Sequence, residues 1–380
     1  MRLGILGGTF NPIHRAHFQM AAVAAKALSL DRVLMLVAAD PPHKTVDDGV
    51  SAADRYRMTD LACREPDCIF PCDLELRRFG KSYTVDTLRT LKKQYPDSEL
   101  FLIIGSDSLQ AFSSWHMPGE ILKLAQLVCV PRTGISQGDV AAADLLEKSF
   151  QKRPILLEDA VPEISSTMIR DRIEQALPIS HLVDGQVEWY IYEHGLYFPE
   201  SLKRIHGQVE RMLPRKRFLH TVGVMLESVR LANLWGADPQ KARLAALLHD
   251  CAKYIDPREL VRLSGDDTGI EAVQHAFAGA AVAKEVFGIQ DPQVLEAVRL
   301  HCTGDTGMEL LDMVIYLADI TEQSRSFPGV EDYRRALEAG PEEAMLFALQ
   351  RGYERLLLEG GGIHPATQRA LQYFQRRLRK

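Results

Sequence analysis

The chain has 380 residues, of which 46% are hydrophobic and 25% are charged, and its formal net charge is -6. This length predicts two domains, and the composition is that of a soluble globular protein. The negative charge argues against broad binding to nucleic acid or to an anionic membrane, although a local basic pocket is compatible with it. Without an apolar run of about 18 residues or a signal peptide, we expect a cytoplasmic protein with no membrane span. A homo-oligomer is compatible with this composition.

The first half of the chain alternates short apolar runs with helical periodicity. We expect strands over residues 3–6, 32–37, 100–104, 127–130 and 155–157, and helices over residues 16–28, 51–64, 84–94 and 167–176. This alternation predicts an α/β doubly wound parallel sheet that is covered on both faces. Ligands of such sheets bind at the carboxyl ends of the strands, so we expect a site there.

Paired glycines, Gly7 and Gly8, directly follow the first predicted strand in the sequence GGTFNPIH. Glycines let the backbone approach a phosphate closely. His14 and His17 stand three residues apart at the start of the next predicted helix, where free N–H groups also favour anions. A glycine turn with two surface histidines is the alternative, but the spacing favours a polyphosphate site.

A second anion-binding pattern is the sequence ISSTMIR at residues 164–170. Ser165, Ser166 and Thr167 are good helix-capping residues, and Arg170 follows one turn later. Their hydroxyl and N–H groups and the guanidinium can hold an anion together. An ordinary helix cap with an exposed arginine is the alternative.

These two motifs resemble the signatures of the nucleotidyltransferases that carry an H-x-G-H motif, although Ala16 stands at the position of the usual glycine. Within this superfamily, the chain is similar to the bacterial nicotinate-nucleotide adenylyltransferases. Further similar sequences are PPHK (41–44), SYTVDT (82–87), IGSD (104–107), WH (115–116) and GLY (195–197). The resemblance covers residues 1–198, which we expect to form a first, Rossmann-like domain.

The resemblance implies that the phosphate of nicotinate mononucleotide attacks the α-phosphorus of ATP, which releases pyrophosphate and forms deamido-NAD. Mg²⁺ is expected with ATP. The implied catalytic residues are His14, His17, Lys44 and Arg170. The implied ATP- and substrate-binding residues are Gly7, Gly8, Thr9, Phe10, Thr84, Gly105, Asp107, Trp115, Ser165, Ser166 and Thr167.

The acceptor is expected to bind beside Trp115, which would stack on the pyridine ring with Thr84 nearby. Partly buried packing is the alternative role for Trp115. Two other acceptors are considered, pantetheine phosphate and nicotinamide mononucleotide, and the sequences around Thr84 and Trp115 argue against the first.

Beyond residue 199 the pattern changes, and no strand is expected from residue 200 to residue 380. Helical periods predict an all-α second domain over residues 199–380. We expect helices over residues 218–234, 241–254, 271–287, 294–301, 310–325, 342–358 and 367–378.

Histidines and aspartates recur along this helical half. An isolated His220 or His275 would be a satisfied core residue, but adjacent His249 and Asp250 on an apolar helix, followed by Lys253, are poorly explained by packing. Imidazole and carboxylate ligands suit iron, manganese or zinc. The candidate metal ligands are His220, His249, Asp250, His275, His301 and Asp319.

The spread of these ligands over separate helices resembles the HD phosphohydrolase superfamily. The sequences HAFAGA (275–280), HCTG (301–304) and LADITEQSR (317–325) are similar to bacterial HD hydrolases that split diadenosine tetraphosphate symmetrically into two ADP. This resemblance covers roughly residues 203–360. Cys302 and Gln323 depart from the threonine and proline that are usual there.

The resemblance implies two metal positions. His220, His249, Asp250 and Asp319 would hold one ion, and Asp250, His275 and His301 the other, so that Asp250 is shared and catalytic. Two such ions can clamp the attacking and leaving oxygens of a phosphoryl group. Iron is the first choice, with manganese or zinc as alternatives. Lys253, Thr303 and Arg325 are the implied phosphate contacts. The alternatives are another nucleotide substrate and a module that only senses nucleotides.

Overall fold

The computed structural model describes residues 1–39, 49–63, 68–78 and 80–379. They form two compact units, one with Met1–Asp171 and Ile179–Tyr190, the other with Arg172–Pro178 and Ile191–Lys380. The helices α7 (Ser166–Glu174) and α8 (Gly185–Glu193) therefore contribute residues to both units. The expected boundary between residues 198 and 199 stays a prediction.

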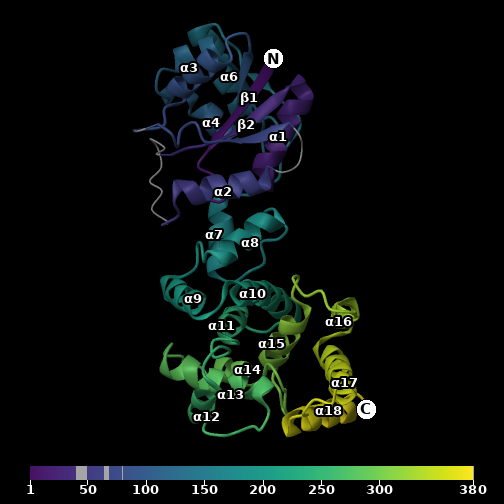
Figure 1. Ribbon diagram of the computed structural model, residues 1–380. Coiled ribbons are helices and arrows are strands. Elements are labelled where there is room, and N and C mark those ends of the chain that lie inside the picture. The colour runs from purple at the N-terminus through teal and green to yellow at the C-terminus, as the bar shows by residue number, and fades with distance from the viewer. Residues whose placement is uncertain (40–48, 64–67, 79, 380) are drawn as a thin grey trace. The chain divides into compact units, whose positions relative to one another are not determined.

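The first unit is built on a six-stranded parallel sheet with the order β3-β2-β1-β4-β5-β6. This confirms the predicted doubly wound fold. Figure 1 labels two neighbouring strands of the sheet, β1 and β2. The order reverses between β1 and β4, which is where such sheets bind ligands. The strands are β1 (Arg2–Gly8), β2 (Arg32–Val37), β3 (Ile69–Cys72), β4 (Glu99–Ile104), β5 (Gln126–Cys129) and β6 (Ile155–Leu156).

Strand β3 was not predicted from the sequence, and it contains Pro71, a residue that is unusual within a strand. The strand lies at the edge of the sheet, where a missing N–H donor is tolerated.

Helices surround this sheet, and one hydrophobic core joins Leu3 and Ile5 of β1 to Val85 and Leu88 of α3. The helices are α1 (Arg15–Leu28), α2 (Ala52–Ala62), α3 (Thr84–Gln94), α4 (Ser106–Gln110), α5 (Pro118–Leu124) and α6 (Gln137–Phe150). Ala21 and Ala24 of α1 are also buried. The alternating apolar positions thus bury both the strands and one side of each helix.

The second unit contains helices and no strand within residues 200–379, as the sequence predicted. Asp238, Asp256 and Asp291 each cap a helix, with a proline at the next position. The helices are α9 (Glu200–Met212), α10 (Arg215–Trp235), α11 (Pro239–Leu248), α12 (Pro257–Ser264), α13 (Glu271–Glu285), α14 (Pro292–Leu300), α15 (Leu310–Thr321), α16 (Val330–Ala336), α17 (Pro341–Glu359) and α18 (Pro365–Arg377).

Five predicted helices of this unit end earlier than expected. Those predicted over 241–254, 271–287, 294–301, 310–325 and 367–378 end at Leu248, Glu285, Leu300, Thr321 and Arg377. The amides of Cys251 and Thr303 donate to Leu248 O and Leu300 O, which tightens the chain into turns. His249 and His301 therefore lie directly after helices rather than within them.

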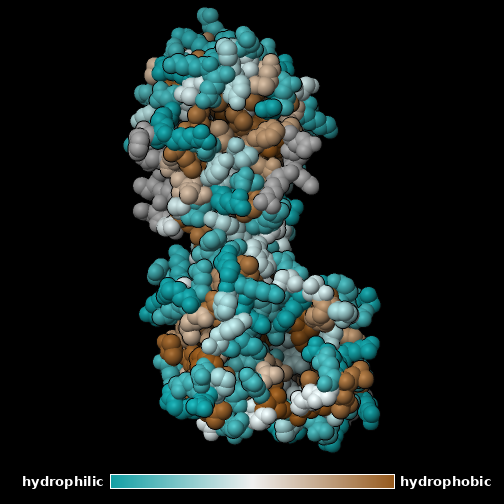
Figure 2. All heavy atoms as spheres, in the orientation of Figure 1, coloured by the Kyte–Doolittle hydropathy of each residue, from teal (hydrophilic) through white to brown (hydrophobic). Residues whose placement is uncertain are grey.

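The visible surface is mostly hydrophilic, with hydrophobic residues in scattered patches (Figure 2). Single exposed apolar side chains such as Leu234 and Leu358 are normal on a protein surface. In the part of the chain that the structure describes, no helix is both long and apolar enough to cross a membrane.

Candidate functional site

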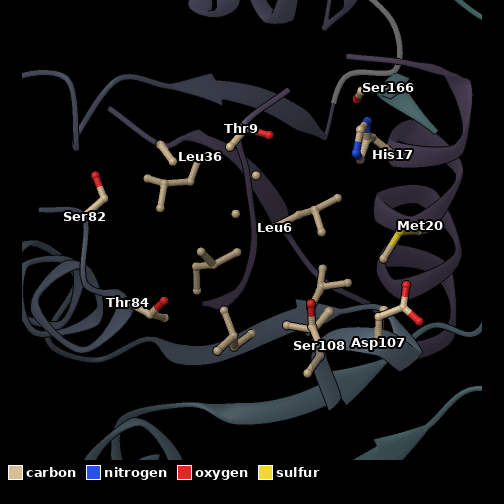
Figure 3. A pocket seen from close by; sticks show the side chains of 18 of the residues that line it. Leu6, Thr9, His17, Met20, Leu36, Ser82, Thr84, Asp107, Ser108 and Ser166 are labelled. Atoms are coloured by element: carbon tan, nitrogen blue, oxygen red, sulfur yellow. The ribbon is translucent and has the colours of Figure 1, made fainter. Parts of the chain in front are cut away.

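A cavity of about 570 Å³ opens at the carboxyl edge of the sheet in the first unit. Figure 3 shows His17 and Ser166 at one end of it, and Ser82 and Thr84 at the other. The site therefore lies at the edge that the sequence pattern indicated. Lining residues that the sequence singled out are Gly7, Gly8, Thr9, His14, His17, Thr84, Gly105, Asp107, Trp115, Ser165, Ser166, Thr167 and Arg170.

Phe10 differs from this set, because it is absent from the described residues that line the cavity. Its side chain is 1% exposed, and its ring meets the ring of His17 edge-on at 4.9 Å. A Cβ atom at Gly8 would lie 2.6 Å from the Phe10 ring, so this packing requires a glycine. The expected binding role of Phe10 stays a prediction, and its ring packs beneath the glycine-rich loop.

The two histidines are arranged for hydrogen bonding to an anion. The backbone N–H of His14 donates to Nδ1 of His17 at 3.3 Å, and the two rings stack with centroids 3.6 Å apart. A neutral His17 therefore carries its proton on Nε2, as a donor. Burial lowers the pKa of His14 to about 4, and the positive charge of Arg132 adds to this shift. His14 is thus uncharged at neutral pH.

Hydrogen bonds join the first turn of α7 to the loop that precedes α1. The hydroxyl of Ser166 donates to Pro12 O at 2.9 Å, and the guanidinium of Arg170 donates to Asn11 O at 2.9 Å. Ser165 Oγ accepts from the amide of Met168, as a helix cap does. The structure thereby brings the two sequence motifs to one cavity. Lys44 lies outside the described residues.

The opposite end of the cavity is aromatic. Trp115 lines it and is half-buried, with its ring 5.1 Å from the ring of Phe112. Helix α3 begins here at Thr84, and the side chain of Tyr83 forms no capping hydrogen bond to it. Thr84, the first residue of α3, therefore brings the N-terminal turn of this helix to the cavity wall.

In the second unit, Asp250 lies at the centre of a cluster of histidines. Its Oδ2 is 3.1 Å from His249 Nε2, and its Oδ1 is 3.2 Å from His275 Nε2 and 3.9 Å from His301 Nε2. Ligand atoms of His220, His249 and Asp250 lie within 4.8 Å of one another. The structure thus brings together candidate ligands from α10, α13 and the turns after α11 and α14.

Asp319 on α15 completes this cluster, because its Oδ1 is 2.8 Å from His220 Nε2. Burial opposes ionisation of Asp319, but His220 and the nearby positive charges outweigh it and lower its pKa. Burial likewise opposes ionisation of Asp250, and the neighbouring histidines hold its pKa well below the usual range. Both carboxylates are therefore ready to bind a cation.

The imidazole rings are held with Nε2 toward the centre of the cluster. Nδ1 of His249 lies 2.6 Å from Ala246 O, and Nδ1 of His301 lies 2.7 Å from Val298 O. Donation from Nδ1 to these carbonyls leaves the Nε2 lone pair for a metal.

Two buried nitrogens, His220 Nε2 and His249 Nε2, have no hydrogen bond of acceptable geometry among the described residues. Carboxylate oxygens lie 2.8 Å and 3.1 Å from them. Buried polar atoms of this kind need a partner. A divalent cation between the imidazoles and carboxylates supplies one, so the residues present fit a metal.

The three expected phosphate contacts lie in different surroundings. Lys253 Nζ is 3.1 Å from His275 Nε2, and Arg325 pairs with Asp319. Thr303 is wholly buried, and its hydroxyl has no partner among the residues that the structure describes. A phosphate contact from Thr303 therefore requires the turn at residues 301–303 to rearrange.

Comparisons with known proteins agree with this division of the chain. Residues 5–172 match a family model described as cytidylyltransferase-like, and residues 217–324 match the HD domain. A "Probable nicotinate-nucleotide adenylyltransferase" of Synechococcus sp. (strain JA-3-3Ab) is 42% identical over 199 residues, which are 52% of this chain and 94% of that protein. A protein of the same name from Dehalococcoides mccartyi (strain ATCC BAA-2266 / KCTC 15142 / 195) is 39% identical over 198 residues, 52% of this chain and 97% of that protein.

The chain belongs to the nicotinate-nucleotide adenylyltransferase family. Residues 217–324 match the HD domain, a kind of domain that binds divalent metals. This range contains all six candidate ligands. A crystal structure from Clostridium acetobutylicum, described as a "predicted HD superfamily hydrolase involved in NAD metabolism", is 33% identical to the chain with a TM-score of 0.44. The match covers 46% of this chain and 97% of the Clostridium acetobutylicum chain.

In the adenylyltransferase half, sequence reasoning missed Arg55 and Arg132. Arg55 of α2 is 1% exposed and donates to Thr9 O and Ala38 O, each at 2.7 Å. It holds the glycine-rich loop against the end of β2, and nothing local in the sequence indicates this. Arg132 lines the cavity two residues after a predicted strand, so its place at the carboxyl edge could have been inferred.

In the HD half, Arg217 and Glu322 were missed. Arg217 donates to Asp250 Oδ2 at 2.9 Å, and the fully buried Glu322 has Oε1 3.1 Å from His220 Nδ1. Each stands three residues from a candidate ligand, Arg217 before His220 and Glu322 after Asp319. Helical spacing of this kind is a usable signal, since residues three apart can share a helix face.

Proposed function

We propose that the first half of the chain transfers the adenylyl group of ATP to nicotinate mononucleotide, giving deamido-NAD and pyrophosphate in NAD biosynthesis. The observation that carries this proposal is that one cavity of about 570 Å³ has polar, anion-binding groups at one end and aromatic side chains at the other. Its volume is in the range of small-ligand pockets. The names of the relatives, which match this half over almost their whole length, support the same reaction.

The phosphate-binding end acts by positioning. The backbone at Gly7 and Gly8, the imidazoles of His14 and His17, and Arg170 surround the space where the polyphosphate would lie. Such donors align the two anionic reactants and disperse the charge that develops on the phosphoryl oxygens, without a covalent nucleophile. Mg²⁺ bound with ATP would neutralise part of the same charge.

The acceptor end favours nicotinate over nicotinamide. The open N-terminus of α3 at Thr84 attracts a carboxylate more strongly than a neutral amide. Trp115 offers an aromatic surface for the pyridine ring. Nicotinate mononucleotide is therefore the proposed acceptor, and nicotinamide mononucleotide is the alternative.

A comparison of the two acceptors tests this assignment. With ATP and Mg²⁺, nicotinate mononucleotide should give deamido-NAD and pyrophosphate at a higher kcat/KM than nicotinamide mononucleotide gives NAD. If nicotinamide mononucleotide gives the higher kcat/KM, it replaces nicotinate mononucleotide as the proposed acceptor. If neither mononucleotide releases pyrophosphate from ATP, the adenylyltransferase assignment is rejected.

We further propose that residues 199–380 form a metal-dependent phosphohydrolase that splits diadenosine tetraphosphate symmetrically into two ADP. The clustering of His220, His249, Asp250 and Asp319, with Asp250 shared toward His275 and His301, supports it. Metal ions bound there, with iron as first choice, would polarise the scissile phosphate.

Positive side chains adjoin this cluster and suit a polyphosphate. Arg217 and Arg325 pair with Asp250 and Asp319, and Lys253 lies against His275. Each is only partly buried, so its charge is open to an anionic substrate.

Product analysis separates the proposal from its alternatives. With Fe²⁺ or Mn²⁺, diadenosine tetraphosphate should yield ADP as the only nucleotide product. AMP with ATP would show asymmetric cleavage, and hydrolysis of another nucleotide alone would change the substrate. If the domain binds nucleotide but hydrolyses none at any concentration of added metal, it is a module that only senses nucleotides.

A further inference from the structure

Cys302 lies against the second half of the metal cluster. Its Sγ is 3.2 Å from His301 Nε2 and 3.5 Å from His275 Nε2. Donor atoms of His275, His301 and Cys302 all lie within 4.8 Å of one another. The thiol thus reaches the same point as the two imidazoles, although no metal role follows from the sequence at this position.

The distances match those between ligands of one ion. Zinc bonds of about 2.3 Å to sulfur and about 2.0 Å to nitrogen place the two donors about 3.6 Å apart in a tetrahedral site. Asp250 Oδ1 adjoins both imidazoles, at 3.2 Å from His275 Nε2 and 3.9 Å from His301 Nε2. Two nitrogens and one sulfur therefore face one another, with a carboxylate oxygen beside the two nitrogens.

Hydrogen bonding from the thiol explains only part of this arrangement. A thiol has one hydrogen, so it can donate to one of the two nitrogens that it contacts. His301 Nδ1 is 2.7 Å from Val298 O, which leaves Nε2 with its lone pair toward Sγ. Lys253 Nζ lies 3.1 Å from His275 Nε2 and contacts the same imidazole.

We propose that Cys302 Sγ is a ligand of the metal ion held by His275, His301 and Asp250, and that it makes this position selective for thiophilic cations. The proposal rests on the metal centre proposed above. Thiolate ligands favour Zn²⁺ and its probe Co²⁺ over Mn²⁺, which prefers oxygen. The two metal positions then differ, because the candidate ligands of the other, His220, His249, Asp250 and Asp319, include no sulfur.

Cobalt spectroscopy tests this ligand directly. The full chain is stripped of metal, reduced and titrated with Co²⁺ without oxygen. The wild-type protein should develop a sulfur-to-cobalt charge-transfer band in the near ultraviolet, and Cys302→Ser should lose it while keeping visible cobalt bands from its other ligands. Cys251→Ala is the matched control, because Cys251 adjoins Asp250 but its Sγ contacts Gly279 O at 3.7 Å.

Metal competition gives a second readout. With a chromophoric chelator as competitor, Cys302→Ser should lower the affinity of its position for Zn²⁺ by about tenfold or more, and should change the affinity for Mn²⁺ much less. Circular dichroism confirms that the variants are folded.

The outcomes distinguish this inference from the metal centre itself. Cobalt that binds the wild-type protein without a charge-transfer band, or a band that survives in Cys302→Ser, overturns the sulfur ligand alone. If neither Co²⁺ nor Zn²⁺ binds the wild-type chain, the sulfur ligand and the proposed metal centre are both rejected.

Discussion

Arg55 shows how one buried side chain can fix the geometry of a binding loop. Its guanidinium donates to Thr9 O, Ala38 O and Ala39 O, which joins the glycine-rich loop to the end of β2. Buried carbonyls that lose such a donor stay unsatisfied, because water cannot reach them easily.

Replacing Arg55 should therefore be costly. Arg55→Leu is expected to lower the free energy of unfolding of the first unit by about 3 kcal/mol, since hydrogen bonds from charged groups are lost. Denaturant titration measures this change. Arg57→Leu is the control, because Arg57 is exposed and pairs only at the surface with Asp60, where a loss below about 1 kcal/mol is expected. Equal losses in both variants would contradict the structural role of Arg55.

His14 gives a pH-dependent prediction. Burial lowers its pKa from 6.5 to about 4, so the unfolded chain binds a proton on this side chain at a higher pH than the folded chain does. The contribution of His14 to stability is thus full above pH 6.5 and falls as the pH decreases toward 4, by about 3 kcal/mol in total.

Two variants isolate this contribution. His14→Gln should show a shallower loss of unfolding free energy between pH 6.5 and pH 4 than the wild-type protein. His181→Gln, at an exposed position, should follow the wild-type curve. An NMR titration that places the pKa of His14 near 6.5 would remove the basis of the prediction.

At the scale of elements, α10 and the residue that follows α15 together orient the candidate metal ligand His220. Glu322 follows α15, and its Oε1 lies 3.1 Å from His220 Nδ1 on α10. Gly223 on α10 makes room for it, because a Cβ there would clash with the Glu322 carboxylate. A glycine inside a helix costs about 1 kcal/mol relative to alanine, so this close approach accounts for its presence.

Loss of this contact should weaken metal binding. Glu322→Ala is expected to reduce metal affinity about 10- to 100-fold, since partners that orient a ligating histidine have effects of this size. Gly223→Ala should act in the same direction by displacing Glu322, and Glu331→Ala on the surface should have no effect. Chelator competition measures the affinities. Unchanged affinity in Glu322→Ala would show that His220 is oriented without it.

The sequence predicts an element well when neighbouring residues determine it, and poorly when contacts between distant segments do. Strands β1, β2 and β4 follow from their apolar runs, while β3 is hidden by Pro71. The candidate metal-binding histidines are recognisable by type, but the helix end at Leu248 is not, because apolar residues such as Cys251 and Ala252 follow it. The contacts of Arg55 and Cys302 join distant segments and leave no local pattern.

On the scale of the whole molecule, the two units hold separate constellations. Residues that line the cavity belong to the first unit, and all six candidate metal ligands belong to the second. No candidate residue of one reaction is shared with the other. The two activities should therefore be separable by mutation.

The most direct test is to measure both reactions in two variants of the full chain. His17→Ala should lower adenylyl transfer by about 100-fold or more, as the loss of a charge-stabilising donor does, and should leave ADP release from diadenosine tetraphosphate intact. His249→Ala should abolish ADP release and leave adenylyl transfer nearly intact. Loss of both activities in either folded variant would contradict two independent sites.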